Sequence, residues 1–274
     1  MKKISQDAAF ILHHYDWSES SLILEVFSRQ LGRISLVAKG AKKPTSNFRA
    51  VLLPLQRLEL AYSLPANDGE ADIGTLKAAH WVSGYTLPQG DALLAGFYVN
   101  ELLLKLLARH DAQPSLFDVY ATCVALLAHQ GKTAALPPAL QGLEGLQGQT
   151  ALILRGFELR LLHGLGLLPA LDSSASGHAL PSMAPDLALY LHPEHGLCLA
   201  ESSAELGQSL PAACWLQLAS ALQAPQPFSA LLPALLAWPG TQRTALRNSL
   251  RHVLHQHIGS PLKTRQLMAT LQGL

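Results

Sequence analysis

The sequence predicts an α+β protein in which an amino-terminal five-stranded OB-type β-barrel precedes a mainly α-helical domain with a small irregular or hairpin insertion. Five short segments before residue 82 alternate apolar and polar residues and are separated by turn formers. After residue 90 Leu and Ala dominate, which is a helix-forming composition. Pro, Gly and Ser then accumulate at residues 169–212 and break any long helix there. We therefore expect a barrel domain at residues 1–82 and a helical domain at 83–274 that contains an irregular subdomain at 169–212.

The strands are expected at residues 8–15, 20–27, 33–38, 51–62 and 73–80. Five short strands in a segment of about 80 residues suit a small closed barrel, because closure removes the edges that a flat sheet exposes. An OB-type barrel is the first candidate and an SH3-like barrel is the second. The number of strands alone does not distinguish them.

The expected helices span residues 92–108, 115–129, 149–162, 241–258 and 261–271. Asp91 is the expected N-cap of the first helix, and Gly259 is expected to end the fourth. Ser260 followed by Pro261 has the pattern of an N-cap with Pro at the first helical position. The Gly-, Pro- and Gln-rich segment 131–148 is expected to be a loop.

Within the irregular subdomain, residues 186–191 and 196–201 are expected to pair as a hairpin. The same subdomain contains four possible metal ligands, which are His178, His192, His195 and Cys198. Structural zinc sites usually have paired ligands, such as two cysteines separated by two residues, and this region has no such pair. The sequence therefore predicts no metal site and no cofactor.

Charge is strongly segregated along the chain although its net charge is only +1. Residues 1–57 have nine Lys or Arg against four acids, and residues 241–274 have five Arg or Lys and no acid. The residues between them have six Lys or Arg against fifteen acids. Such asymmetry favours a polyanionic partner, of which nucleic acid is the most common, while a solvated basic face with no partner is the alternative.

The basic residues between Val26 and Leu58 are the sharpest signal, because this stretch contains no Asp or Glu. Gly40 and Pro44 keep the loop at residues 39–49 out of regular structure, and its cations are spaced to follow a phosphate backbone. Phe48 and Tyr62 are either stacking surfaces for unpaired bases or ordinary core residues. The predicted nucleic-acid-binding residues are Arg29, Arg33, Lys39, Lys42, Lys43 and Arg49.

A second basic face is expected on the helix at residues 241–258. Arg243, Arg247 and Arg251 recur at every fourth position and therefore share one side of the helix. The opposite side carries an apolar stripe of Leu246, Leu250, Val253, Leu254 and Ile258. This face is a secondary nucleic-acid surface or a solvated one.

No catalytic motif is present: the chain has no nucleophile elbow, no phosphate-binding glycine loop ending in Lys-Ser/Thr and no paired-histidine zinc motif. We therefore expect a binding protein that is not an enzyme. The three scattered cysteines fit free thiols of a reducing cytoplasm, and no apolar run is long enough to span a membrane.

Five segments in order along the chain have a recognisable pattern: residues 17–27, WSESSLILEVF; 32–41, GRISLVAKGA; 98–103, YVNELL; 155–162, RGFELRLL; and 261–265, PLKTR. Together they resemble the bacterial RecO family of DNA repair proteins. The resemblance covers nearly the whole chain. It implies an amino-terminal OB barrel and a carboxy-terminal helical domain, as the composition does.

The resemblance also implies a function. Members of this family bind single- and double-stranded DNA, anneal complementary strands, and act with RecR to load RecA on gaps coated with single-stranded DNA-binding protein (SSB). RecA is thus an indirect partner, and the expected location is the cytoplasm, at the nucleoid. An RNA-binding OB module and a non-catalytic protein scaffold are the alternatives. Competition between DNA and RNA oligomers would distinguish the RNA-binding module from a DNA-binding protein, and absence of salt-dependent oligonucleotide binding would favour the scaffold.

The resemblance further implies a site for the acidic tail of SSB on the helix at residues 149–162, formed by Arg155, Phe157, Leu161 and Leu162. Many relatives also carry a four-cysteine zinc site in the region that corresponds to residues 171–200. Here Cys198 is the only cysteine of that region, beside Ser173, Ser174 and Ser176, so zinc is not expected.

Overall fold

A computed structural model describes residues 2–65, 73–84, 86–130 and 149–272 of the chain. The chain divides into two compact units, of which the first comprises Met1–Ala128 and Leu262–Leu274 and the second His129–Pro261. The first two helices and the last one thus belong with the barrel, although the expected division lay at residue 82. The loop expected at residues 131–148 lies outside the described residues.

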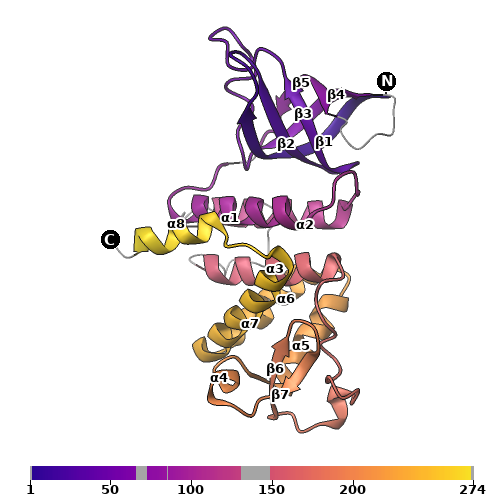
Figure 1. Ribbon diagram of the computed structural model, residues 1–274, viewed down its shortest axis with the longest axis vertical. Coiled ribbons are helices and arrows are strands. Elements are labelled where there is room, and N and C mark those ends of the chain that lie inside the picture. Colours follow the sequence, from indigo (N-terminus) through magenta and orange to yellow (C-terminus); the bar gives the residue numbers. More distant parts are fainter. Residues whose placement is uncertain (1, 66–72, 85, 131–148, 273–274) are drawn as a thin grey trace. The chain divides into compact units, whose positions relative to one another are not determined.

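The five strands of the first unit form a closed barrel in the order β1-β2-β3-β5-β4, with β1 also pairing with β4 (Figure 1). Neighbouring strands are antiparallel except β3 and β5, which pair in parallel. This arrangement confirms the predicted OB-type barrel. The strands are β1 (Lys2–Asp16), β2 (Leu22–Ser28), β3 (Gly32–Ala38), β4 (Arg57–Leu64) and β5 (Gly74–Trp81).

The fourth strand begins six residues later than predicted. Leu55 adopts a left-handed conformation with a φ of 63°, and Leu53 N–H bonds the Val51 carbonyl in a tight turn. Leu55 is buried against Gly96 of α1 (Asp91–Leu106), where an added Cβ would lie 2.5 Å from a leucine methyl carbon. Apart from one isolated bridge between Pro54 and Ile11, the apolar character of residues 51–55 therefore reflects packing at the end of the barrel and not strand pairing.

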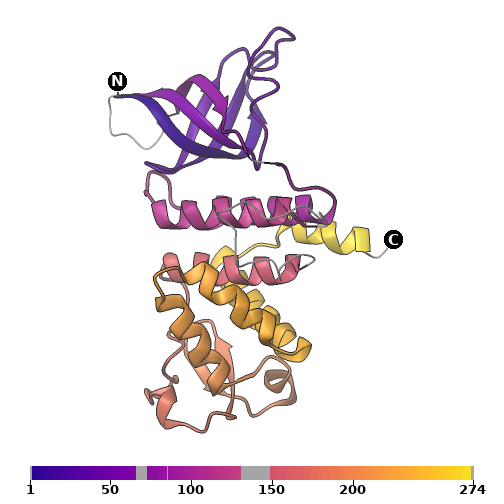
Figure 2. The same cartoon turned by 180° about the vertical axis from the view of Figure 1, so that it is seen from behind.

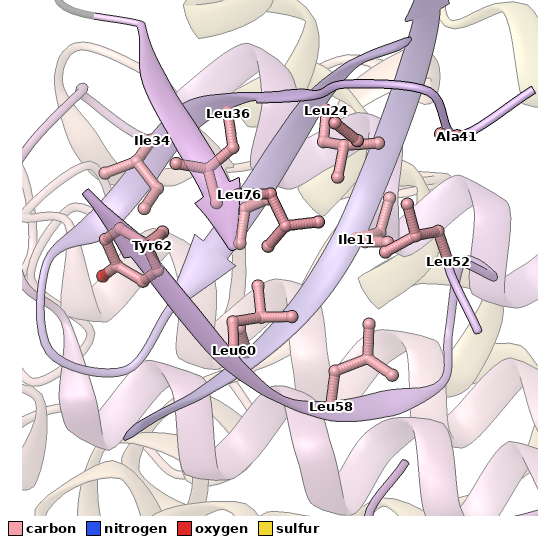
Figure 3. Packing of buried hydrophobic residues seen from close by; sticks show 13 residues of the cluster. Ile11, Leu24, Ile34, Leu36, Ala41, Leu52, Leu58, Leu60, Tyr62 and Leu76 are labelled. Atoms are coloured by element: carbon pink, nitrogen blue, oxygen red, sulfur yellow. The ribbon is translucent and has the colours of Figure 1, made fainter. Parts of the chain in front are cut away.

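The interior of the barrel is a continuous apolar cluster to which every strand contributes (Figure 3). Tyr62 is part of it, and its hydroxyl donates a hydrogen bond of 2.7 Å to the buried Asp7 carboxylate. Burial, followed by this hydrogen bond, raises the pKa of Tyr62 well above its usual value. The possibility that Tyr62 stacks on bases is therefore wrong, because the ring is enclosed in the core.

The outer face of β1 and β2 is covered as well, by the aromatic residues of α2 (Pro114–Ala128). The ring of Phe10 lies 5.4 Å from Phe117 and 4.8 Å from Tyr120, and Phe27 lies 5.3 Å from Phe117. A strand that is buried on both faces has a sequence of nearly continuous apolar residues. This explains the uninterrupted run from Ala9 to Leu12 and shows why α2 belongs to the barrel unit.

An ion-pair network ties β2 and β3 to the end of α1. The carboxylate of Glu25 is 5% exposed and accepts hydrogen bonds from Arg33 at 2.9 Å and Arg109 at 2.7 Å. Burial by itself raises the pKa of Glu25, but the hydrogen bonds from Arg109, Arg33 and Ser35 outweigh it and lower this pKa below its usual value. Nη1 of Arg33 also donates to the carbonyls of Leu104 in α1 and of Leu107, which directly follows this helix. Arg33 therefore joins the barrel to the carboxyl end of a helix, where a cation is favourable.

The turn between β2 and β3 requires glycine. Gly32 has a φ of 71°, and a Cβ added there would lie 1.8 Å from the carbonyl oxygen of Asp111. His110 N–H also donates to the Arg33 carbonyl at 3.0 Å. The connection between α1 and α2 is thus held directly against this turn.

The carboxyl-terminal helix α8 (Lys263–Gln272) is held by Glu101 of α1. The carboxylate of Glu101 accepts the backbone N–H groups of Lys263 at 2.8 Å and Thr264 at 2.9 Å, together with the Thr264 hydroxyl. Glu101 therefore satisfies the free donors at the start of α8, and the helix begins two residues after the Pro261 start that the sequence predicted. Asp91 is likewise not an N-cap but the first residue of α1, after Gly90.

The second unit packs helices against a small sheet (Figure 2). Its sheet contains the predicted hairpin with shorter strands, and the predicted apolar stripe of α7 (Gly240–Ile258) is buried at four of its five residues. No element was predicted for residues 213–240, where two helices occur, the second with Pro233 inside it. The elements are α3 (Thr150–Gly164), η3 (Leu180–Ser182), β6 (Ala188–His192), β7 (Gly196–Leu199), α4 (Ser203–Leu206), β8 (Leu210–Pro211), α5 (Ala212–Gln223), α6 (Pro227–Ala237) and α7 (Gly240–Ile258).

In the residues that the structure describes, no helix has the length and apolarity needed to cross a membrane.

Candidate nucleic-acid interface

The β2–β3 hairpin separates the predicted DNA-binding residues into two groups. Ser28 pairs with Gly32 at one end of the hairpin and Leu22 with Ala38 at the other. The two ends of a seven-residue strand are about 20 Å apart. Arg29 and Arg33 lie at the first end, and the other four cations follow the second end.

The two arginines at the first end are already paired with other groups of the same chain. The guanidinium of Arg29 makes two hydrogen bonds to Asp118 of α2, at 2.8 and 3.0 Å, and this pairing raises the pKa of Arg29. The Arg29 side chain is nevertheless 46% exposed, whereas that of Arg33 is 18% exposed and directed to Glu25 and two carbonyls. Arg33 is consequently left out of the interface that we propose, and Arg29 lies away from the loop cations.

The cations at the second end lie on a loop that is built from successive turns. N–H groups of Lys43, Ser46 and Arg49 bond the carbonyls three residues earlier, and Gly40 supplies a left-handed φ of 71° at the start. Short turns keep the side chains close together while exposing Lys39, Lys43 and Arg49. Within the described part of the chain, these three form no ion pair.

Lys42 connects this loop to the turn between β1 and β2. Its backbone N–H donates to the Ser20 carbonyl at 2.9 Å, and its ammonium group lies 3.2 Å from the Asp16 carboxylate. The Asp16 side chain is largely exposed, so this ion pair is weak and open to exchange with a phosphate. The loop and the turn therefore lie together at one end of the barrel.

Exposed aromatic side chains that the sequence pattern did not predict accompany the cations at this end. Trp17 is 61% exposed and Tyr15 is 50% exposed, both in or beside the β1–β2 turn. Trp81 at the end of β5 is also exposed, and its indole N–H donates to the carbonyl of Val51. The sequence feature that indicates such an exposed ring is a tryptophan in a polar turn, Asp16-Trp17-Ser18, where no core residue is expected.

This combination of charge and aromatic surface is suited to a single-stranded polyanion. Cations neutralise phosphates, and exposed rings offer stacking surfaces that any base can use. OB-type barrels bind oligonucleotides through the loops at this kind of position. Burial, followed by the charge of His14, lowers the pKa of His13, so His13 adds little positive charge at neutral pH.

The second basic face lies on α7, in the other unit. Arg247 and Arg251 are exposed and Arg243 is half-buried, while Leu246, Leu250 and Val253 of the same helix are buried. The three arginines thus share the outer side of α7, as the spacing predicted. Their role in DNA binding stays a prediction.

The residues of the expected SSB-tail site lie on α3. Phe157, Leu161 and Leu162 are fully buried, and Arg155 pairs with Glu158 one turn later on the same helix. These apolar side chains therefore belong to the packed interior and do not line an open slot. The Arg155 side chain is 14% exposed, more than the other three of the set, and its guanidinium is paired with the buried Glu158 carboxylate.

The segment that corresponds to the zinc site of relatives is held by hydrogen bonds between small polar side chains. Ser176 Oγ lies 3.0 Å from Ser174 Oγ and 2.9 Å from His178 Nδ1, and the His178 N–H donates to Ser174 Oγ. Cys198 is half-buried on β7 and contacts the Gly196 carbonyl. In the described ranges, no three His, Cys, Asp or Glu side chains are grouped so as to hold a metal ion.

Comparison with known proteins agrees with this architecture. The N-terminal family model of recombination protein O matches residues 1–85, and the C-terminal model of the same protein matches residues 87–266. The chain is 49% identical to the DNA repair protein RecO of Variovorax paradoxus over 99% of this chain and 98% of the relative. It is 50% identical to RecO of Delftia acidovorans, over 100% of this chain and 98% of that relative. The chain therefore belongs to the RecO family of DNA repair and recombination proteins.

Proposed function

We propose that this RecO-family protein is a recombination mediator that binds DNA through the loop end of its barrel, anneals complementary single strands and, with RecR, helps to load RecA on SSB-coated gaps. One observation carries the proposal: the four cations of the loop at residues 39–49 lie beside exposed aromatic rings at one end of an OB-type barrel. The contacting residues are Lys39, Lys42, Lys43 and Arg49. The protein would act in the cytoplasm, at the nucleoid.

The mechanism follows from which part of the DNA the cations contact. Two complementary strands repel each other because both backbones are negative, and neutralising phosphates lowers this barrier. Contacts to phosphates carry no sequence information and leave the base edges free. A second strand can then align with the held strand in successive registers until complementary bases pair. No reacting group is needed, so the proposal includes no enzymatic turnover of a small molecule.

An annealing assay on SSB-coated complementary oligonucleotides tests the proposal. We expect the wild-type protein to accelerate duplex formation and the Lys42→Glu, Lys43→Glu variant to lose most of this acceleration. Equal acceleration by both proteins would contradict the role of the loop. Tighter binding of an RNA oligomer than of DNA with the same sequence would instead favour an RNA-binding module, and absence of any salt-dependent oligonucleotide binding would favour a protein scaffold.

A second proposal concerns the acidic tail of SSB, which we infer contacts Arg155 on α3. The support is that Arg155, 14% exposed, is the member of the predicted set whose guanidinium reaches the surface, where a peptide carboxylate would bind it in addition to the buried Glu158. We expect Arg155→Glu to weaken binding of a peptide with the SSB tail sequence at least about tenfold, because a charge-assisted pair becomes a repulsion. Titration calorimetry with the peptide measures this, and an unchanged affinity would remove Arg155 from the site.

The third proposal is that the segment at residues 171–200 keeps its structure without zinc. The hydrogen bonds among Ser174, Ser176 and His178 support it, because they connect the loop where a metal would otherwise do so. We expect the purified protein to contain far less than one zinc per chain, and a chelator to leave its melting temperature unchanged. Stoichiometric zinc with a lower melting temperature after chelation would contradict this.

A further inference from the structure

A pocket of about 430 Å³ opens at the loop end of the barrel, between the β1–β2 turn and the loop that follows β3. Its volume lies in the range of about 300–1,000 Å³ that is usual for ligand pockets. It is formed entirely within the first unit. The lining residues are His14, Asp16, Leu22, Ala41, Lys42, Phe48, Arg49, Leu52 and Leu53.

The pocket has an apolar floor and a polar rim. Ala41 and Leu52 belong to the barrel cluster, on the side where Ile11 and Leu24 lie (Figure 3), and Phe48 packs against the same cluster. The apolar wall is therefore continuous with the core, which fixes its shape. Lys42 and Arg49 supply two positive charges at the rim, of which only the first is paired, with Asp16.

Backbone contacts form the pocket before any ligand binds. The Lys42 N–H bond to the Ser20 carbonyl joins the two walls, and the Arg49 N–H bond to the Ser46 carbonyl shapes the outer one. The Val51 and Leu52 N–H groups both bond the Phe48 carbonyl, which directs residues 48–53 back toward the barrel. A preformed pocket costs less ordering on binding than one that a mobile loop must assemble.

We propose that this pocket holds one unpaired base of a single strand, and that it makes the interface prefer single strands to duplex. The proposal rests on the proposed function, because the loop cations must bring the backbone to the rim. A planar base suits an apolar wall, and the phosphates on either side of it meet Lys42 and Arg49. In a duplex the base is stacked and paired, and extracting it costs free energy that an unpaired base does not require. One captured base leaves its neighbours free for pairing, so the pocket is compatible with annealing.

The test compares two oligomers of equal length and equal charge. One is a 5′-labelled thymidine oligomer of about 20 nucleotides, and the other consists of abasic tetrahydrofuran units joined by the same phosphates. Fluorescence anisotropy of the full-length protein at fixed salt measures both affinities. We expect wild type to bind the thymidine oligomer about 5- to 150-fold more tightly, which is the usual contribution of one stacked base.

Variants then assign the difference to the pocket. Leu53→Trp fills the pocket and is expected to lower the ratio of the two affinities at least about fivefold, leaving the share that the exposed rings of Tyr15 and Trp17 contribute, with little change in affinity for the abasic oligomer. Leu206→Trp, the same change at an exposed position of the second unit, is the matched control and is expected to leave the ratio unchanged. Leu22→Phe, which also reduces the pocket, is the second variant in case Leu53→Trp does not fold.

The outcomes distinguish this proposal from the proposed function. Equal binding of both oligomers by wild type would overturn the pocket as a base site and leave the backbone contacts in place. A preference for thymidine that is undiminished in both pocket variants would assign all base contact to another surface, such as the exposed rings, and also overturn it. Absence of salt-dependent binding to either oligomer would overturn the proposed function itself.

Discussion

The Lys42→Glu, Lys43→Glu double variant is expected to bind a single-stranded oligonucleotide on the order of 10- to 100-fold more weakly than wild type at the same moderate salt concentration. Two of the four proposed phosphate contacts become repulsive, and the new glutamate at position 42 also faces Asp16. Neither lysine contributes its ammonium group to the core, so the barrel should remain folded. Fluorescence anisotropy with a labelled oligomer measures the affinity, and the melting temperature checks the fold.

The dependence on salt gives a sharper readout than one affinity. Each phosphate contact to a single strand contributes about −0.7 to the slope of log affinity against log salt, so four contacts predict about −2.8 and two about −1.4. Lys2→Glu, Lys3→Glu is a matched control, because it makes the same change in net charge at the other end of β1. We expect its slope to equal that of wild type. An equal loss in both variants would mean that only net charge matters and that the loop is not a specific contact.

The barrel was predictable because its signals are local. Alternating apolar residues located all five strands, and the structure differs mainly where the apolar pattern had another cause. The run Val51 to Leu55 is apolar because it covers the barrel end and packs on α1, which depends on contacts distant in sequence. The amino-terminal part of β1 was missed because Lys2 to Gln6 is polar and pairs along an exposed edge with β4.

The grouping of elements into units was not predictable from composition. Leu- and Ala-rich sequence begins near residue 90, yet α1 and α2 pack against the barrel. What holds them there is a set of pairs distant in sequence, such as Phe10 with Phe117 and Arg33 with the Leu104 carbonyl of α1. A residue in isolation carries no sign of such a partner. The helices between residues 212 and 237 were missed because their apolar residues show no clear stripe and because prolines interrupt the segment.

The candidate site was predicted in part for the same reason. Loop cations are visible in sequence because an acid-free basic stretch with Gly and Pro has few structural explanations. Arg33 belongs to the same stretch, but its strand position places it opposite Phe27 and beside Glu25, next to the end of α1. Charge alone does not distinguish an arginine that faces solvent from one that bonds a carboxylate and two carbonyls. The structure distinguishes Arg33 from the solvent-facing cations by its hydrogen-bond partners, and the resulting difference in effect on stability can be measured.

Replacing Arg33 by methionine is expected to destabilise the barrel unit by about 2–4 kcal/mol. The variant keeps much of the apolar stem but removes the guanidinium, so a carboxylate that is 5% exposed loses one of its two arginine partners. The Leu104 and Leu107 carbonyls lose a donor in the same step. Hydrogen exchange of the β2 and β3 amides, followed by mass spectrometry, measures stability within this unit without assuming that both units unfold together. The expected rise in exchange rate is about 30- to 1,000-fold for amides that exchange by unfolding of this unit.

Arg29→Met is the matched control, because it removes the same group from the same hairpin. Arg29 and Asp118 are both about half exposed, so their ion pair contributes about 0–1 kcal/mol and exchange of the same amides should rise at most about fivefold. The two variants also separate structure from DNA contact. At a temperature where Arg33→Met is fully folded, its affinity for the single strand should stay within about twofold of wild type, whereas the lysine variant loses affinity with no loss of protection. Weaker DNA binding by Arg33→Met with unchanged amide exchange would reverse this assignment, since it would mean that the guanidinium leaves Glu25 to contact a phosphate.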